Sequence, residues 1–361
     1  MKILGIETSC DDTGIAVLEV TENEKNPEFR ILSNIVASQI DVHQEYGGVF
    51  PSLAKREHQK NLPITLQQAL KEAGIEKADA VAVTYGPGLS PCLWTGLNFA
   101  KDLAQKWNVP LIPVDHIEGH LLIGLLKLTN ENSEFPILNF ETEDAFPAIG
   151  LIVSGGHTQL VLVKDIGEYE IIGETRDDAA GEAFDKTARL LGLAYPGGPA
   201  VAAAAALAGK PAIGIKLPRP MVHSKDYDFS FSGLKTAVLY DFQSRAPEVQ
   251  QSKEYVQAMA HEIQQAIVDI LVSKTTRAVK EYAAASVILG GGVAANDELR
   301  RVFEATLQTL QILLLAPPKN LSTDNGAMIA VAGYFQFQKG NILKEKGEFE
   351  NLEAQPNLRI A

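Results

Sequence analysis

Apolar and polar residues alternate along the first forty positions in a way that predicts three successive strands. Lys2 to Ile6 is a short apolar run that ends in a polar turn, Glu7 to Gly14, and Ile15 to Val20 is apolar again. Strand, polar turn, strand is the simplest interpretation of this pattern. Ile31 to Ser38 continues it as a third strand.

The next segments alternate between helical and strand-like patterns. His58 to Ala73 and Leu93 to Trp107 carry apolar residues at helical spacing, whereas Ala80 to Thr84 and Pro110 to Val114 are short apolar runs typical of buried strands. Strands that alternate with helices predict an α/β layer structure.

The same plan then restarts about 145 residues further on, which is the kind of internal repeat that reveals an architecture. Ala148 to Ser154 and Gln159 to Lys164 predict a second pair of strands around a glycine-rich turn. Predicted helices at Ala183 to Leu191 and Tyr255 to Tyr282 follow, and then a strand at Ser286 to Leu289. We therefore expect two duplicated domains that face each other across a cleft, where backbone N–H groups of glycine-rich turns suit phosphate.

The predicted boundaries place residues 1–128 and 322–340 in the first domain and residues 148–321 in the second. Residues 129–147 contain five acidic residues and no Lys or Arg, which favours an acidic linker or a solvated surface loop. The polar residues 341–361 are expected to form a partly ordered tail.

Composition narrows the class of protein. The chain has 361 residues, two of them cysteines, and its opening residues lack the pattern of a signal peptide. No apolar stretch approaches the roughly 20 residues that a membrane helix needs. We therefore expect a cytoplasmic protein without a membrane partner.

The formal net charge of −13 argues against a protein that binds nucleic acid nonspecifically through many phosphate contacts. The net charge does not exclude a local basic patch. If the substrate is RNA, we expect a partner protein to share its binding. The chain lacks G-x-x-x-x-G-K-[ST], so it has no ordinary P-loop.

Two histidines, His116 and His120, have the spacing that places both rings on one face of a helix. Such a pair is also common as a core or capping pair, so a carboxylate is needed to indicate a metal. Asp324 precedes the predicted helix Ala327 to Phe337, where it is either an N-cap or a third ligand. Two His and one carboxylate with open positions suit ferrous iron or catalytic zinc.

Two other types of catalytic site are disfavoured. A zinc protease carries H-E-x-x-H, whereas Glu118 stands two residues after His116 and points away from a metal. Cys10 in the first polar turn is flanked by Asp11 and Asp12, which raise a thiol pKa, so packing is favoured over nucleophilic catalysis.

Ten segments that span nearly the whole chain carry a resemblance to a known family: GIETSCDDTGIAV, YGGVFPSLAKREH, GPGL, DHIEGH, LIVSGGHTQLV, DDAAGEAFDK, YPGGP, DFSFSGLKTAV, GGGVAAN and STDNGAMIA. In this order they resemble the tRNA N6-adenosine threonylcarbamoyltransferase family, in its bacterial branch, within the actin, Hsp70 and sugar-kinase (ASKHA) superfamily.

The resemblance implies a set of site residues. His116, His120 and Asp324 would hold one Fe²⁺ per subunit, with Zn²⁺ as the alternative. The residues that would bind the phosphate region and the adenosine half of the substrate are Ile152, Val153, Ser154, Gly155, Gly156, Asp185, Gly198 and Asn296.

The implied reaction transfers the threonylcarbamoyl group of threonylcarbamoyl-AMP to N6 of adenosine 37 in tRNAs that read codons beginning with A. Asp11 is the first candidate for guiding the amine proton and His157 is the second. Five basic residues are candidate tRNA contacts, each equally interpretable as solvated surface charge: Lys55, Arg56, Lys60, Arg176 and Lys235.

The resemblance also implies two protein partners, a shorter paralogue that dimerises with the chain and a small P-loop ATPase. Two alternatives stay open. One is an ATP-hydrolysing protein of the Hsp70 or sugar-kinase type, which would bind Mg²⁺ through carboxylates rather than histidines. The other is a non-catalytic scaffold of the same complex.

Overall fold

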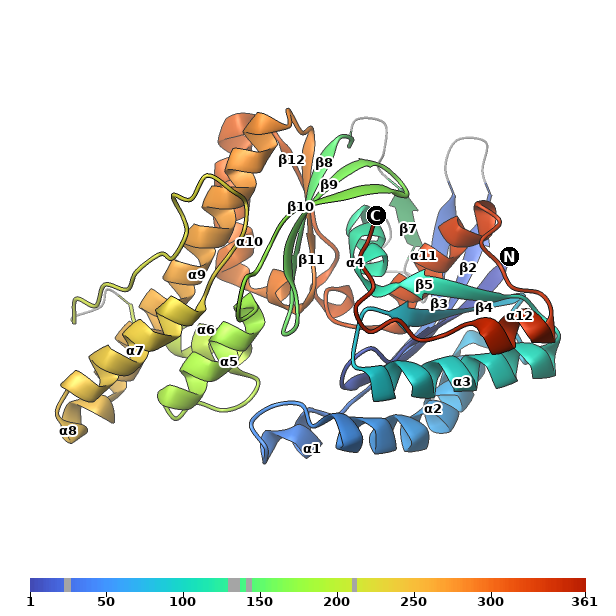
Figure 1. Cartoon of the computed structure of the whole chain (residues 1–361), viewed down its shortest axis with the longest axis horizontal. Helices are drawn as coiled ribbons and strands as arrows, with labels where there is room; N and C mark the ends of the chain where they lie inside the picture. Colours follow the sequence, from blue (N-terminus) through green and yellow to red (C-terminus); the bar gives the residue numbers. More distant parts are fainter. Residues whose placement is uncertain (23–26, 129–136, 141–144, 210–212) are drawn as a thin grey trace. The chain divides into compact units, whose positions relative to one another are not determined.

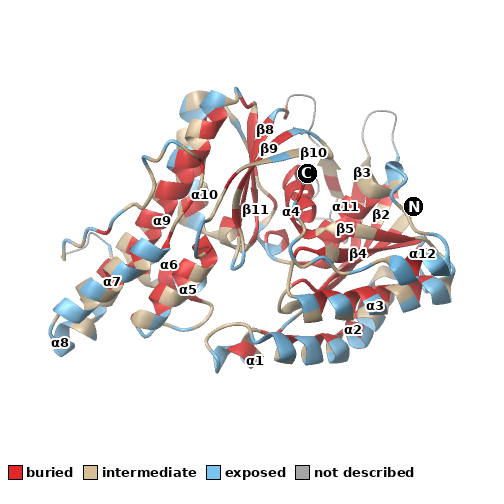
Figure 2. Ribbon diagram, viewed as in Figure 1, coloured by how far each residue is buried: buried red, intermediate tan, exposed pale blue. Residues whose placement is uncertain are grey.

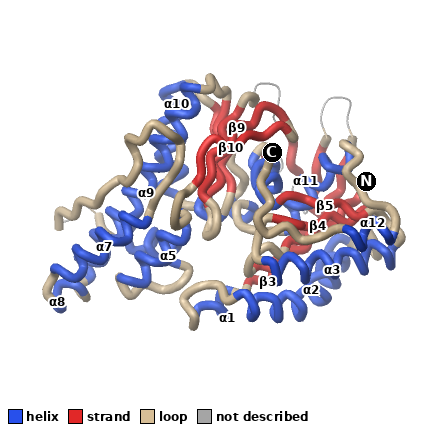
Figure 3. The backbone as a smooth tube through the Cα atoms, viewed as in Figure 1, coloured by secondary structure: helices blue, strands red, loops and turns tan. Residues whose placement is uncertain are grey.

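The computed structural model of the chain describes residues 1–22, 27–128, 137–140, 145–209 and 213–361. The chain divides into two compact units, Met1–Thr142 with Ala316–Ile360 and Glu143–Leu315 with Ala361. Each unit contains one β-sheet with helices packed against it (Figure 1, Figure 3). Among the described residues, no helix is both long enough and apolar enough to cross a membrane.

The first unit has a seven-stranded sheet in the order β5-β4-β1-β2-β3-β7-β6. The first three strands form an antiparallel meander, and β4 and β5 extend it parallel to β1. The strands are β1 (Lys2–Glu7), β2 (Asp12–Thr21), β3 (Glu28–Ser38), β4 (Ala80–Gly86), β5 (Leu111–Asp115), β6 (Leu126–Leu128) and β7 (Ile137–Phe140).

Helices cover both faces of this sheet. They are α1 (Ile40–Gln44), α2 (Pro51–Ala73), α3 (Ser90–Trp107), α4 (His116–Gly124), α11 (Gly326–Gln338) and α12 (Lys346–Asn351), with a 3₁₀ turn at Lys319–Leu321. Because side chains alternate across a strand, Leu4 and Ile6 join the core that α2 and α3 complete, whereas Gly5 faces α11.

The second unit has a five-stranded sheet in the order β10-β9-β8-β11-β12. Its strands are β8 (Ala148–Val153), β9 (Thr158–Asp165), β10 (Glu168–Glu174), β11 (Ser286–Gly290) and β12 (Leu313–Leu315). Every residue of β8 and β11 is buried, as the central strands of a covered sheet should be (Figure 2).

The helices of the second unit follow its meander. They are α5 (Ala180–Leu190), α6 (Gly197–Ala206), α7 (Ser232–Ser244), α8 (Pro247–Gln250), α9 (Lys253–Glu281) and α10 (Asp297–Leu310), with a 3₁₀ turn at Gly292–Ala295. The longest, α9, buries a stripe of small and aliphatic residues against the sheet and α6.

The two sheets confirm the predicted duplication. In each unit three consecutive strands form an antiparallel meander, a later strand pairs in parallel with the first of them, and a last strand pairs in parallel with that one. Strands β8, β9, β10, β11 and β12 therefore repeat β1, β2, β3, β4 and β5. The polar turn after the first strand therefore recurs at the same topological position. The cleft expected between the domains stays a prediction.

Two segments differ from their expected form. Residues 341–361 are ordered on the first unit: Leu343 exchanges backbone hydrogen bonds with Leu111, Phe349 is buried, and Gln355 N donates to Tyr85 O at 2.7 Å. A few buried apolar residues in a polar segment anchor it, and such spacing gives no periodic signal.

The acidic segment also contains more than a linker, because Ile137–Phe140 forms β7 and pairs with β3 and β6. Residues 129–136 and 141–144, which hold its five acidic side chains, lie outside the described residues.

Candidate functional site

The two histidines lie on one face of α4, as their spacing predicts. The helix begins directly after β5, and the Asp115 carboxylate caps it by accepting from Ile117 N at 2.7 Å and Glu118 N at 3.3 Å. His116 is the first residue of the helix and His120 follows one turn later, with ring centroids 4.7 Å apart. Both side chains are almost completely buried.

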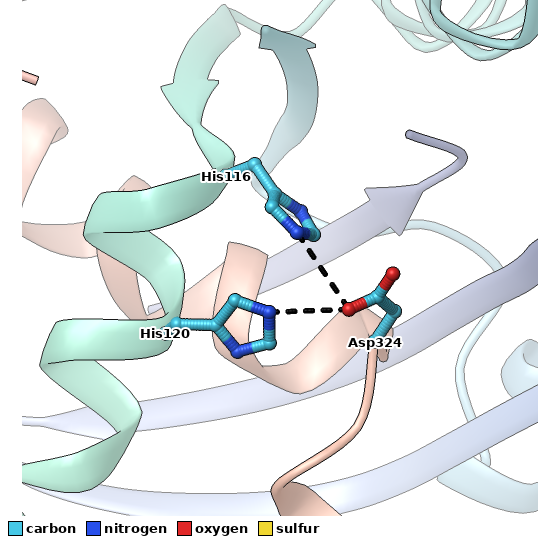
Figure 4. Close-up of side chains that lie close together, drawn as sticks. All are labelled: His116, His120 and Asp324. Atoms are coloured by element: carbon cyan, nitrogen blue, oxygen red, sulfur yellow. Dashed lines mark hydrogen bonds and ion pairs between the residues drawn. The ribbon is translucent and has the colours of Figure 1, made fainter. Parts of the chain in front are cut away.

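Asp324 reaches this pair from the loop before α11. The N-cap of α11 is Asn325, whose side chain accepts from Ala327 N and Met328 N, so the capping alternative for Asp324 is wrong. Asp324 Oδ1 lies 3.1 Å from His120 Nε2 and 3.6 Å from His116 Nε2 (Figure 4). The three donor atoms all lie within 4.8 Å of one another.

This arrangement fits a divalent transition metal. Two imidazole nitrogens converge on one carboxylate oxygen, which is the donor set that iron and zinc share and that magnesium does not prefer. Two of the three candidate ligands come from one face of α4 and the third from a loop, so they would leave other coordination positions of the metal open.

Glu7 supports His116 from the end of β1, and the sequence analysis missed it. Its Oε2 lies 3.1 Å from His116 Nδ1, while Thr84 Oγ1 and Ser9 N donate to its two oxygens. A carboxylate that accepts from Nδ1 fixes the ring and directs Nε2 toward the metal position. The available signal was an acidic residue at the last position of an apolar strand.

The pKa values of this pair reflect their mutual contact. Burial alone would raise the pKa of Glu7, but the charge of His116 and the hydrogen bond to it outweigh burial and lower that pKa. Burial alone would lower the pKa of His116, but the charges of Glu7 and Asp324 raise it to about 9. Metal binding at Nε2 would therefore displace a proton.

His120 has a different environment. Burial lowers its pKa despite the hydrogen bond to Asp324, so the ring is neutral, which is the form that binds metals. Its Nδ1 has no hydrogen-bond partner within the described part of the chain. The two histidines are thus held unequally: Nδ1 of His116 contacts the Glu7 carboxylate, whereas Nδ1 of His120 has no such partner among the described residues.

Glycines bring Asp324 close enough to the histidines. A Cβ on Gly326 would collide with the backbone of β1 and β2 at Ala16 N, Ile15 C and Gly5 O. Gly5 and Gly14 meet α11 in the same way. Close approach of the α11 N-terminus to the two strands therefore requires residues without a side chain.

Glu118 points away from the metal ligands, as expected. Its Oε2 accepts from Gln336 Nε2 at 2.6 Å. The geometry of a zinc protease, with a glutamate beside the metal, is therefore absent from α4.

The β1–β2 turn holds the proposed proton acceptor. Burial raises the pKa of Asp11, and the charge of Asp324 adds to this, while a hydrogen bond with Cys10 opposes it. Burial is the largest cause that raises the pKa of Asp12 to about 7, and the negative charge of Asp11 is the second largest. Asp12 was not singled out in the sequence; its burial became visible only in the fold.

Cys10 does not have the properties of a nucleophile. Burial and the charges of Asp11 and Asp324 raise its pKa well above the ordinary value. A neutral, packed thiol agrees with the interpretation favoured from the sequence.

The β8–β9 turn of the second unit has a different composition. Gly155 and Gly156 are exposed, and a Cβ added to either would meet no atom within 4 Å. Gly156 N and His157 N both point at Ser154 Oγ, at 3.3 and 3.1 Å. Two adjacent amides aimed at one oxygen resemble the backbone nests that bind anions.

Ile152 and Val153 lie within β8 rather than in this turn. Both side chains are completely buried, and Ile152 pairs with Gln159 on one side and Gly290 on the other. Any contact of theirs with a substrate is therefore limited to the backbone at the strand end. His157 is half-buried in the turn.

The predicted adenosine-binding residues also lie in the second unit. Asp185 Oδ1 on α5 accepts from Gly197 N at 2.6 Å, and an added Cβ on Gly198 would have open space around it. Asn296 caps α10 by accepting from Leu299 N at 3.0 Å and donates to Gln264 Oε1 at 3.0 Å. Their role toward a substrate stays a prediction.

Two of the candidate tRNA contacts, Arg176 and Lys60, already have structural partners. Arg176 donates to Asp226 and Asp228 at 2.7 and 2.8 Å. Lys60 pairs with Glu57, whereas Lys55 and Arg56 are exposed on α2.

Comparison of the chain with known proteins identifies its family. Residues 30–331 match the TsaD family, tRNA N6-adenosine threonylcarbamoyltransferase. A protein of that name from Thermosipho africanus is 44% identical over 362 residues, covering 100% of both chains. One from Bacillus subtilis is 43% identical over 364 residues, covering 100% of this chain and 96% of its own.

Solved structures agree in fold. Full-length HypF in a phosphate- and nucleotide-bound form has a TM-score of 0.54 at 14% identity, covering 93% of this chain and 56% of that one. HypF from T. kodakarensis has a TM-score of 0.58 at 12% identity, covering 96% and 49%. These values support the actin-like duplicated fold. The family model and the relatives that match over the whole chain establish that it belongs to the tRNA N6-adenosine threonylcarbamoyltransferase family.

Proposed function

We propose that the chain transfers the threonylcarbamoyl group of threonylcarbamoyl-AMP to N6 of adenosine 37 in tRNAs that read codons beginning with A. The adenosine amine attacks the carbamoyl carbon, the bond from that carbon to the phosphate oxygen breaks, and AMP leaves. The observation that carries the proposal is the convergence of His116, His120 and Asp324 in a chain that matches members of this family over their whole length.

His116, His120 and Asp324 would hold one Fe²⁺, with Zn²⁺ as the alternative. When bound, such an ion supplies Lewis acidity toward a carbonyl or phosphate oxygen. Glu7 orients the His116 ring through Nδ1, and the α11 N-terminus delivers Asp324. The charge on Glu7 keeps His116 basic and therefore a strong donor.

The second unit would bind the AMP half. We place the phosphate at the turn from Ser154 to His157, where the glycines leave the backbone accessible. The N–H groups of Gly156 and His157, which donate to Ser154 Oγ in the free chain, would exchange that oxygen for a phosphate oxygen. Asp185 and Asn296 offer polar groups to a nucleoside, and Gly198 leaves room for it.

The amine proton requires an acceptor, and Asp11 is the first candidate. Its raised pKa makes the carboxylate a stronger base than an exposed aspartate. His157 is the second candidate.

We place the reaction in the cytoplasm, with two protein partners: a shorter paralogue that dimerises with the chain and a small P-loop ATPase that helps turnover. A chain with a net charge of −13 also gains from a partner that shares the binding of tRNA. Tyr46 and Phe50 beside α2 are more than half exposed and stack 5.8 Å apart, which suits a protein interface.

The test is direct measurement of modified adenosine 37 in tRNA incubated with purified chain, its partners and threonylcarbamoyl-AMP. Stoichiometric AMP release with formation of the modified base is the expected result. ATP hydrolysis by the chain without modification would favour the Hsp70-like alternative. Modification that proceeds equally without the chain would favour a scaffold.

A further inference from the structure

A buried histidine on α2, His58, is not part of the metal cluster but contacts the turn that carries Asp11. Its side chain is completely buried although α2 lies on the outside of the first unit. Nδ1 lies 2.8 Å from Thr13 Oγ1, and Nε2 lies 3.0 Å from the carbonyl oxygen of Cys10. One side chain therefore contacts both ends of the Cys10–Thr13 segment.

The chemistry of these partners fixes the tautomer. A carbonyl oxygen can only accept, so Nε2 carries the proton and donates to Cys10 O. Nδ1 is then the acceptor, and the Thr13 hydroxyl donates to it. Burial lowers the pKa of His58, which agrees with a neutral ring.

The other contacts of the turn hold its earlier residues. Ser9 O accepts from Leu89 N at 2.7 Å, and Ser9 Oγ lies 3.3 Å from His116 Nδ1. Thr8 Oγ1 donates to Cys92 O. These contacts fix the turn as far as Ser9, and His58 fixes the peptide that follows.

We propose that His58 is a positioning residue for the transfer reaction: by donating to the carbonyl of Cys10, it fixes the Cys10–Asp11 peptide and thereby the Asp11 carboxylate. The inference rests on the proposed role of Asp11 as proton acceptor. Small displacements of a reacting group cost up to about 10²-fold in rate, so a hydrogen bond to its backbone has a kinetic effect.

Two substitutions separate the two hydrogen bonds of the ring. In His58→Gln the amide nitrogen can replace Nε2 and donate to Cys10 O, whereas in His58→Asn the amide oxygen can replace Nδ1 and accept from Thr13. We expect kcat to fall about 10²-fold in His58→Ala and comparably in His58→Asn. We expect His58→Gln to lose no more than about fivefold, the effect of one neutral hydrogen bond.

The measurements are kcat and KM for tRNA modification by the full chain with its partners, together with metal content and thermal unfolding. Metal content should equal that of the parent in all three variants, because His58 contacts none of the ligands. Gln59→Ala, on the exposed face of α2, is the matched control and should keep the parent kcat. Equal loss of kcat in the Gln and Ala variants, in step with their unfolding temperatures, would overturn the proposal.

A double-mutant cycle with Asp11→Asn tests the assigned target. If His58 acts through Asp11, His58→Ala should cost nothing further in an Asp11→Asn background. A multiplicative loss would overturn the proposal, as would parental kcat in His58→Ala beside a collapsed Asp11→Asn. Parental activity of Asp11→Asn would instead remove Asp11 from the proposed function, and the inference with it.

Discussion

The β1–β2 turn of the first unit and the β8–β9 turn of the second follow the first strand of equivalent sheets, yet they offer different chemistry. The first turn is filled with buried polar side chains: Glu7, Thr8 and Ser9 are almost inaccessible and bonded to neighbouring elements. In the second turn Gly155 and Gly156 are exposed, and no side chain covers their backbone.

The difference shows how a duplicated scaffold can be specialised. The five equivalent strands have the same order in both units, so packing requires the sheet but not the contents of the turn. In the first unit the turn supports a ligand histidine and an aspartate. In the second, two backbone amides converge on the Ser154 hydroxyl oxygen, an arrangement that suits an anion in place of that oxygen.

Among the substitutions that test this difference between the two units, we expect Asp324→Asn to have the largest effect on metal content and transfer. We expect metal content and transfer to fall by more than the 10- to 100-fold that an outer-shell partner is typically worth, because a ligand is lost. Metal analysis and the modification assay measure both. Glu118→Gln is the matched control, since Glu118 belongs to α4 and pairs with Gln336. Metal retained in Asp324→Asn would contradict the assignment.

A pair of glycine substitutions compares the two units directly. Gly326→Ala places a Cβ against the backbone of β1 and β2, so we expect destabilisation of about 3 kcal/mol and reduced metal content. Gly156→Ala meets open space, so the unfolding temperature should be unchanged while KM for the donor rises. Thermal unfolding and kinetics distinguish these outcomes. Equal destabilisation of both variants would refute the contrast.

Glu7→Gln tests the support of His116 without removing a ligand. Glutamine can still accept from Nδ1 but lacks the charge, so metal affinity should weaken about 10- to 100-fold. Competition with a chelator of known affinity measures the change. An unchanged affinity would show that Glu7 matters only for folding.

The smallest effect concerns Asp12. Its pKa rises from the ordinary 3.8 to about 7 in the folded chain, so the folded state binds the proton more tightly. The free energy of unfolding therefore falls as pH rises between these two values. Asp12→Asn should unfold at a higher temperature than the parent, with a larger gain at pH about 8 than at pH about 5. An equal rise in unfolding temperature at both pH values would show that the raised pKa of Asp12 is not the cause.

The sequence predicted the repeated part of the fold well. Apolar runs and polar turns gave the meander and its repetition, since central strands bury both faces and show continuous hydrophobicity. Residues 341–361 were harder to predict, because Phe349 and Leu343 anchor that segment at a spacing without a period.

The His116–His120–Asp324 cluster was predictable in part, because the two histidines have helical spacing, whereas the pattern left Asp324 open between an N-cap and a third ligand. The residues that support the cluster and the neighbouring turn were not predictable from the sequence. Glu7 and His58 act across the sheet or from another helix, at separations of 109 and 48 residues from their partners. Only the tertiary fold joins such residues: the sequence marks Glu7 as an acidic residue at the end of an apolar strand, but not its contact with His116.

The most direct test of the central claim measures metal content and threonylcarbamoyl transfer together, in the native chain and in His116→Ala. The account predicts metal in the native protein and the loss of both metal and transfer in the variant. Full transfer by a metal-free His116→Ala chain would contradict it, because the cluster would then have no part in the reaction.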